Sequence, residues 1–163
     1  MKAITLTQPW ATLVAIGAKR IETRSWRTHY RGPLAIHAAK ALPPEWRISA
    51  WDRRFAELLE SLCGLDQYGA PDLAQLPAGM VLATATLAQC TPTDTLHPSG
   101  QEHAFGDFTP GRWGWLLENA QPLPTPITAT GHLGLWNWSE AQPPHQPRAL
   151  SAAPSSPFAI RHS

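Results

Sequence analysis

The sequence has little of several features that would place a protein in a specialised class. It contains only two cysteines, Cys63 and Cys90, and they form no CxxC pair. The seven histidines show no metal-ligand spacing, so we expect no metal site. No apolar run reaches the roughly 18 residues of a membrane span, and no leader segment is evident. We therefore expect a soluble, cytoplasmic protein with reduced thiols and no membrane partner.

Catalytic signatures are equally scarce. The chain has no P-loop, no dinucleotide-binding fingerprint and no G-x-S-x-G elbow, so no cofactor is expected. Charged residues make up only 15% of the chain, and the net charge is +1, which excludes a general basic field. The charge is uneven, however, because residues 19–31 contain five basic residues and one acidic residue. This segment predicts a local positive patch. Its charged residues are Lys19, Arg20, Glu22, Arg24, Arg27 and Arg31.

The remaining composition favours a small mixed fold. The 163 residues suit one domain, and 17 prolines argue against a helical bundle. Short alternating runs predict strands at residues 3–6, 20–26, 33–38, 80–89 and 112–120, with one or two more within 126–138. A helix begins near Pro9 and ends at Gly17, and another runs from Pro43 or Pro44 to Gly64. Between residues 91 and 111 we expect a polar loop with a helical turn near 101–105.

This order predicts an α+β fold, a small β-barrel of about five to six strands with two main flanking helices. Residues 1–138 would form the domain. Residues 139–163 contain five prolines and few apolar residues, so we expect a disordered tail.

Several motifs carry a family resemblance. Gly17, Lys19, Glu22 and Arg24 follow the pattern G-x-K-x-x-E-x-R. Further motifs that fit the same family occur in the expected order at residues 8–10, 30–33, 36–38 and 104–138. Over roughly residues 1–138 the chain resembles the ASCH (activating-signal-cointegrator homology) domain family. The resemblance implies a PUA-like β-barrel, a fold associated with RNA binding.

The first functional hypothesis is a cationic cleft for RNA or a modified nucleotide. On a strand, Glu22 and Arg24 point to the same side, and Lys19 lies at the preceding helix–strand corner. Arg24 and Arg31 would hold a phosphate, and Glu22 would accept a hydrogen bond from a base edge. The alternative is an ion-pair cluster that only connects helix and barrel. Gln8 opens the first helix, where it could meet an anion or simply cap the helix.

Aromatic residues offer a second route to nucleic acid. Trp26 shares a strand side with Arg24, so it is the best candidate for stacking on a base. Trp113, Trp115, Trp136 and Trp138 could stack as well, although large rings also fill small barrels. His37 lies on an otherwise apolar strand and is interpreted as structural.

Two other function classes stay open. One is a hydrolase, either a ribonuclease or an amidohydrolase on a modified nucleoside, with Lys19 and Glu22 as catalytic residues. The similar amidohydrolases carry Thr three residues after the Lys, where this chain has Glu22. Lys19 would act as a base only with a lowered pKa, and Glu102 offers a further carboxylate. The other class is a coactivator-like protein-interaction module.

Overall fold

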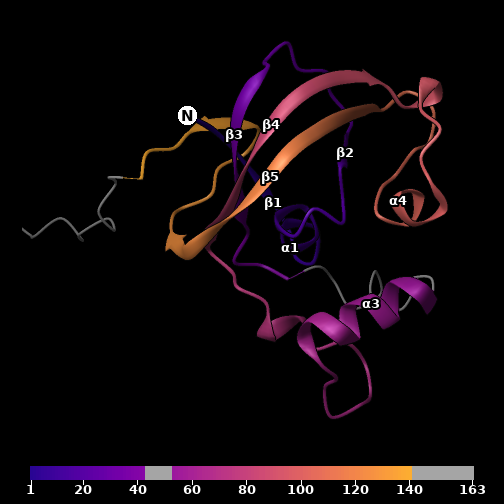
Figure 1. The fold of residues 1–163 in the computed structure, drawn as a ribbon, viewed down its shortest axis with the longest axis vertical. Helices are drawn as coiled ribbons and strands as arrows, with labels where there is room; N and C mark the ends of the chain where they lie inside the picture. Colours follow the sequence, from indigo (N-terminus) through magenta and orange to yellow (C-terminus); the bar gives the residue numbers. More distant parts are fainter. Residues whose placement is uncertain (43–52, 141–163) are drawn as a thin grey trace, which may run out of the picture.

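The computed structural model describes residues 1–42 and 53–140. Within them, six strands form one curled sheet in the order β2-β5-β4-β3-β1-β6 (Figure 1). β1 and β3 are parallel and all other neighbours are antiparallel. The strands are β1 Lys2–Leu6, β2 Ile21–Arg24, β3 Gly32–Ala38, β4 Met80–Pro92, β5 Trp113–Thr128 and β6 Leu135–Asn137. The predicted α+β class is confirmed, and the predicted small barrel of about five to six strands is a six-stranded curled half-barrel.

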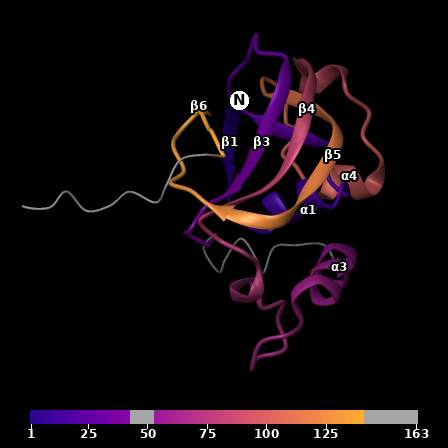
Figure 2. The same cartoon turned by 60° about the vertical axis from the view of Figure 1, so that its left-hand side comes forward.

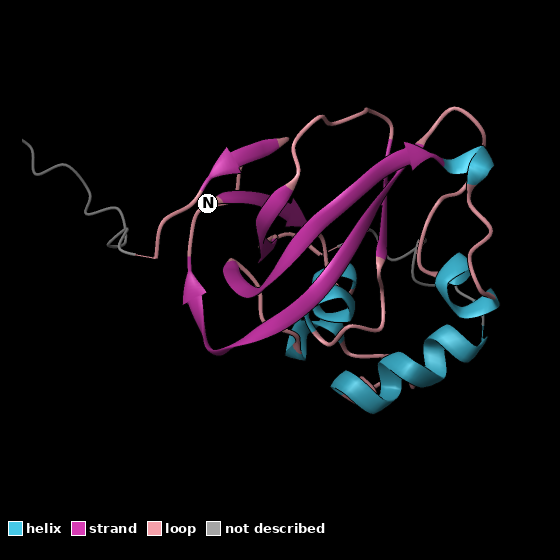
Figure 3. Cartoon of the chain, turned by 45° about the horizontal axis from the view of Figure 1, so that its top comes forward, coloured by secondary structure: helices cyan, strands magenta, loops and turns pink. Residues whose placement is uncertain are grey.

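Helices cover one end of this half-barrel. α1 (Trp10–Ala15) lies at the open end of the curl, and α3 (Arg53–Cys63) lies beyond it (Figure 2). α4 (Gly100–Ala104) and two 3-10 turns, Leu73–Gln75 and Thr93–Thr95, complete the helical segments of the described residues (Figure 3). The predicted start of the second helix near Pro43 lies outside the described residues, as does the predicted tail beyond residue 140.

The first helix forms much as its sequence predicts. The Gln8 side chain accepts a hydrogen bond from the Thr12 amide at 3.2 Å, which satisfies one of the unpaired donors at a helix start. Gly17 follows the helix with φ +77°, a conformation that favours glycine at a helix end. Leu13 packs against Phe55 and Leu59 of α3, so the two helices share a small apolar core.

Two predicted strands differ from the observed ones. The predicted run at 112–120 and the beginning of the predicted segment 126–138 form one continuous strand, β5, despite its prolines. Only Trp113–Leu116 pair with β2, so the later part of β5 has β4 as its one strand neighbour. Proline is tolerated there because an edge strand has unpaired amide positions. β2 ends at Arg24 rather than at residue 26, because residues 25 and 26 form a bend.

His37 lies in β3 and is 2% exposed. Its Nε2 lies 3.1 Å from the Ala129 carbonyl oxygen, which assigns the neutral ring's proton to Nε2. Nδ1 is buried and has no partner among the described residues. Burial lowers the pKa of His37, opposed in part by the bond to Ala129, and nearby His132 adds to the lowering. Burial therefore favours the neutral form of this imidazole.

Acidification should destabilise the protein through His37. As pH falls below about 6.5, the unfolded chain binds a proton that the native ring resists, so stability decreases with falling pH. The contribution is at most about 1.4 kcal/mol per pH unit. Urea unfolding at pH 7.5 and 5.5 should show a smaller pH dependence for His37→Gln than for the wild type. Equal pH dependence of the two proteins would contradict this assignment.

Candidate functional site

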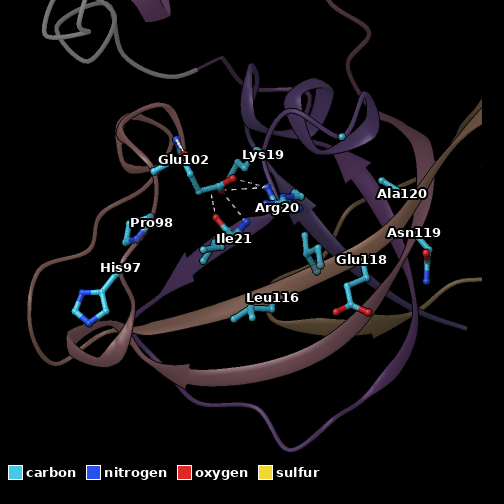
Figure 4. Close-up of a pocket in the computed structure, with 13 residues that line it drawn as sticks. Lys19, Arg20, Ile21, His97, Pro98, Glu102, Leu116, Glu118, Asn119 and Ala120 are labelled. Carbon is cyan, nitrogen blue, oxygen red and sulfur yellow. Dashed lines mark hydrogen bonds between the residues drawn. The ribbon is translucent and has the colours of Figure 1, made fainter.

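The candidate site is built on the edge strand β2 and the loop at residues 96–112 that covers it. Glu102 of α4 is buried, and its two carboxylate oxygens each accept a hydrogen bond from the Arg20 amide at 3.1 Å. One of them also accepts from the Ile21 amide at 2.8 Å (Figure 4). These bonds satisfy backbone donors that an edge strand would otherwise leave open. Glu102 thus anchors the start of β2 to the loop.

Lys19 is buried immediately before this strand, with 1% of its surface exposed. Its Nζ donates hydrogen bonds to the Ile21 carbonyl and, at 2.7 Å, to the Phe105 carbonyl. The Glu22 carboxylate lies 3.5 Å from the same nitrogen. Burial lowers the pKa of Lys19, while the charges of Glu22 and Glu102 oppose that shift.

These contacts indicate what Lys19 does chemically. Three acceptors surround its three N–H donors, which is the environment of an ammonium ion. A general base must instead offer a lone pair to a substrate within hydrogen-bond reach. The geometry therefore suits Lys19 as a positioning cation beneath Glu22.

Glu22 links Lys19 to Arg24. Its Oε1 lies 3.0 Å from the Arg24 Nε, and the Arg24 Nη2 donates to the Thr5 carbonyl at 3.0 Å. The predicted contact among Lys19, Glu22 and Arg24 is therefore present. The side chains of Glu22 and Arg24 are 12% and 26% exposed, so this chain of contacts runs from the interior to the surface.

A cavity of about 480 Å³ is lined by Glu22 and Arg24 but not by Lys19. Arg112 enters it from the end of the covering loop, with its Nε 3.3 Å from an Asp107 carboxylate oxygen. The Arg112 Nη2 also lies 3.5 Å from the Thr23 carbonyl oxygen. The lining residues are Thr5, Leu6, Thr7, Trp10, Glu22, Thr23, Arg24, Ala104, Phe105, Gly106, Asp107 and Arg112.

The net positive charge predicted for this cleft is absent from its lining. Two arginines face two carboxylates, those of Glu22 and Asp107, so the formal charges balance. The predicted charge is absent because Arg24 is the one basic residue of segment 19–31 that lines this cavity, and Glu22 balances it. Asp107 and Arg112, which lie more than 80 residues after β2, add a second balanced pair. The cleft is better described as two arginines, each held in place by a carboxylate.

A second, larger cavity of about 660 Å³ is lined by Glu102 itself and by Lys19 (Figure 4). Leu116 and Glu118 of β5 line it together with Arg20, Ile21 and residues of the 97–102 loop. Among its described lining residues, none belongs to the Glu22–Arg24 pair. The predicted site residues are therefore divided between the two cavities, because Glu22 and Arg24 line the smaller one and Lys19 lines the larger one.

The other predicted binding residues lie elsewhere. Gln8 is fully buried, and its Nε2 donates to the Pro77 carbonyl at 2.7 Å, so its amide is occupied inside the protein. Arg31 is exposed, and its Nη1 donates to the carbonyls of Thr28 and Tyr30. Neither residue lines the 480 Å³ cavity.

The tryptophans divide between core and surface. Trp115 is fully buried, and Trp136 and Trp138 are also core residues. Trp26 is half-buried and meets Trp115 edge-on, with ring centroids 4.7 Å apart, so it is less available for stacking than its sequence position suggested. Trp113 is half-buried, and the Arg27 guanidinium lies over its ring.

Comparison with known proteins identifies the family. The sequence model of the ASCH domain matches residues 4–140, and the chain belongs to the ASCH domain family. Activating signal cointegrator 1 of Mus musculus is 33% identical over 136 residues, which are 82% of this chain and 21% of that protein. The Homo sapiens protein of the same name is 33% identical over 87 residues, which are 53% of this chain and 14% of that protein. The chain thus spans about a fifth or less of these relatives.

Solved structures of the same family are similar to this fold. The ASCH protein of Zymomonas mobilis aligns with a TM-score of 0.48 at 14% identity, covering 85% of this chain and 87% of that one. A point mutant of that protein aligns with the same TM-score at 15% identity, covering 85% of this chain and 91% of the mutant chain.

Two features are absent from the described residues, a metal-binding cluster and a membrane-spanning helix. No group of three or more His, Cys, Asp or Glu side chains there could hold a metal ion. Of the helices in residues 1–42 and 53–140, none has the length and apolar character needed to cross a bilayer.

Proposed function

We propose that this ASCH domain binds single-stranded RNA or a nucleotide in the 480 Å³ cavity. The observation that supports this most directly is the pair of fixed arginines at the cavity. Arg24 and Arg112 are 26% and 29% exposed, and each is held by a carboxylate and a backbone carbonyl. A guanidinium fixed in this way loses little freedom when it binds a phosphate or a base edge.

Arg24 has donors to spare for such a ligand. Its Nη2 donates to the Thr5 carbonyl, whereas its Nε lies within ion-pair distance of Glu22 but makes no hydrogen bond with the described residues. Glu22 can in turn accept from the exocyclic amine of a base, because it is partly exposed beside Arg24. Recognition would depend on these directed bonds more than on net charge.

Replacing Arg24 by alanine should weaken RNA binding roughly 10- to 100-fold, the usual effect of losing a hydrogen bond to a charged group. Fluorescence anisotropy with a labelled 12-nucleotide single-stranded RNA at 50 and 200 mM salt measures the effect. If Arg24 contacts a phosphate, the salt slope should fall by about 0.7 per lost contact. Arg24→Lys should bind with intermediate affinity, since lysine keeps the positive charge but lacks the planar, bidentate guanidinium.

Arg53→Ala is the matched control. Arg53 is an exposed arginine of α3 that is paired with Glu57 and does not line the cavity. Its loss removes the same charge and should leave affinity within about twofold of the wild type. Absence of binding by the wild type at 50 mM salt would refute the proposal, as would equal losses for the Arg24 and Arg53 variants.

The hydrolase and protein-interaction alternatives are secondary. For the hydrolase, Lys19 would have to leave its three acceptors to take a proton, and its side chain has no exposed surface. Glu102 is buried and its carboxylate accepts from the Arg20 and Ile21 amides, which leaves Glu22 as the predicted residue that could act as a base. An assay for product release with the same RNA and with modified nucleosides accompanies the binding experiment.

A further inference from the structure

Trp113 stands directly beside the proposed RNA site. It is the first residue of β5 and pairs with Arg24 of β2 in the antiparallel register. Residues directly opposite each other in such a pair extend to the same face of the sheet. The indole of Trp113 and the guanidinium of Arg24 therefore share a face. Trp113 also follows Arg112 in sequence, so it is flanked by both arginines of the cavity.

Arg27 covers the ring of Trp113. Its guanidinium carbon lies 5.2 Å from the ring centroid, within the range of a cation–π contact. Arg27 is exposed, and the described residues place no carboxylate within ion-pair distance of it. Trp113 is half-buried and packs against the main apolar core, so its ring is held in position. The result is a rigid indole with a movable planar cation on it.

We propose that Arg27 and Trp113 form a stacking platform for a second, unpaired base, next to the nucleotide held in the cavity. This proposal rests on the proposed function and extends its ligand from a single nucleotide to a single-stranded segment. The base stacks on the indole, and the displaced guanidinium of Arg27 moves to the adjoining phosphate.

Replacing the Arg27 guanidinium by a base on the Trp113 ring is energetically favourable. A cation–π contact at an exposed site contributes about 2- to 5-fold to an equilibrium, whereas a base stacked on an aromatic ring contributes about 5- to 150-fold to affinity. Arg27 is not lost when it is displaced, because a flexible arginine beside a phosphate gains a charge-assisted contact. Only an unpaired base can reach the ring, because the bases of a duplex stack on each other.

The test compares two ligands. Uridine 5′-monophosphate reports the cavity alone, and a hexauridylate RNA reports the cavity and platform together. Trp113→Leu should weaken hexauridylate binding by about 5- to 150-fold and change monophosphate binding by less than twofold. Arg27→Ala should weaken hexauridylate binding and reduce its salt slope by about 0.7. Tyr68→Ala removes an 85% exposed aromatic outside the site and should change neither affinity.

Each outcome separates the platform from the cavity. If the wild type binds neither ligand, the proposed function fails and the platform with it. If the wild type binds both and Trp113→Leu binds hexauridylate equally well, the platform is overturned and the cavity stands. If Trp113→Leu weakens both ligands equally, Trp113 is only structural and the platform is likewise overturned.

A crosslinking measurement covers the case in which Trp113→Leu does not fold. The wild-type protein is irradiated with a hexanucleotide that contains 5-iodouridine, and crosslinked peptides are mapped by mass spectrometry. A crosslink at Trp113 supports the platform. Crosslinks confined to other residues of a bound complex overturn it.

Discussion

Replacing Lys19 by methionine should lower the free energy of unfolding by about 2–4 kcal/mol, a large share of the stability of a domain of this size. Methionine fills a similar volume and donates no hydrogen bond. The carbonyls of Ile21 and Phe105 would then lose their buried donor, at a cost of about 1–3 kcal/mol each. Burial of the Lys19 ammonium is unfavourable, as its lowered pKa indicates. Methionine carries no charge, so the loss of this desolvation penalty offsets part of the cost.

Lys19→Met should also weaken RNA binding. Without the ammonium, Glu22 keeps only Arg24 as a charged partner, so both side chains gain freedom at the cavity. Urea unfolding measures the stability effect, and anisotropy at a temperature where the variant is folded measures binding. Lys2→Met serves as a control, since Lys2 is a lysine of β1 with no ion pair among the described residues. A loss below 1 kcal/mol for Lys19→Met would show that its bonds contribute little.

Comparing Lys19→Met, Glu22→Gln and the double variant separates the ion pair from the carbonyl bonds. If the Lys19–Glu22 pair contributes, the double variant should be less destabilised than the sum of the two single variants. Exact additivity would assign the whole effect of Lys19 to the carbonyls of Ile21 and Phe105.

The part of the site that could be predicted from sequence is the part set by local geometry. Alternation along a strand places Glu22 and Arg24 on one side, and the helix end at Gly17 leaves Lys19 within reach of them. Each of these statements depends on neighbours within a few residues. The same local rules gave the approximate positions of the strands and of the first helix.

The rest of the site depends on contacts between distant residues. Glu102 reaches Arg20 across 82 positions, and Asp107 and Arg112 bring a second ion pair to the cleft. No periodicity in the sequence encodes which loop covers the edge of β2. Gln8 shows the same limit, because its occupied amide depends on the Pro77 carbonyl, 69 positions away.

The sequence could not distinguish core tryptophans from partly exposed ones for a related reason. Alternation predicts that Trp113 and Trp115 share a face, and it does not predict how far the sheet curls over each ring. In the half-barrel, Trp115 pairs with Glu22 and is fully buried, whereas Trp113 lies at the strand end and stays half-exposed. The ring at the end of the strand is therefore only partly buried, and the ring two residues later is core.

Replacing Trp115 by alanine should accordingly produce the largest loss of stability, about 3–5 kcal/mol. Its side chain is fully enclosed in the main core and meets Trp26 edge-on at 4.7 Å, so alanine leaves a cavity that the curled sheet cannot close. The melting temperature should fall by roughly 6–20 °C, measured by circular dichroism. Tyr68→Ala, at an exposed aromatic, should stay within about 0.5 kcal/mol of the wild type.

Trp115→Phe distinguishes packing from hydrogen bonding in this prediction. The indole Nε1 is buried and has no partner among the described residues, so phenylalanine removes an unsatisfied donor while it keeps a ring in the core. The phenylalanine variant should therefore lose much less stability than the alanine variant. Equal losses for both would mean that the indole N–H makes a stabilising contact, for instance with an ordered water, and that the ring is not held by packing alone.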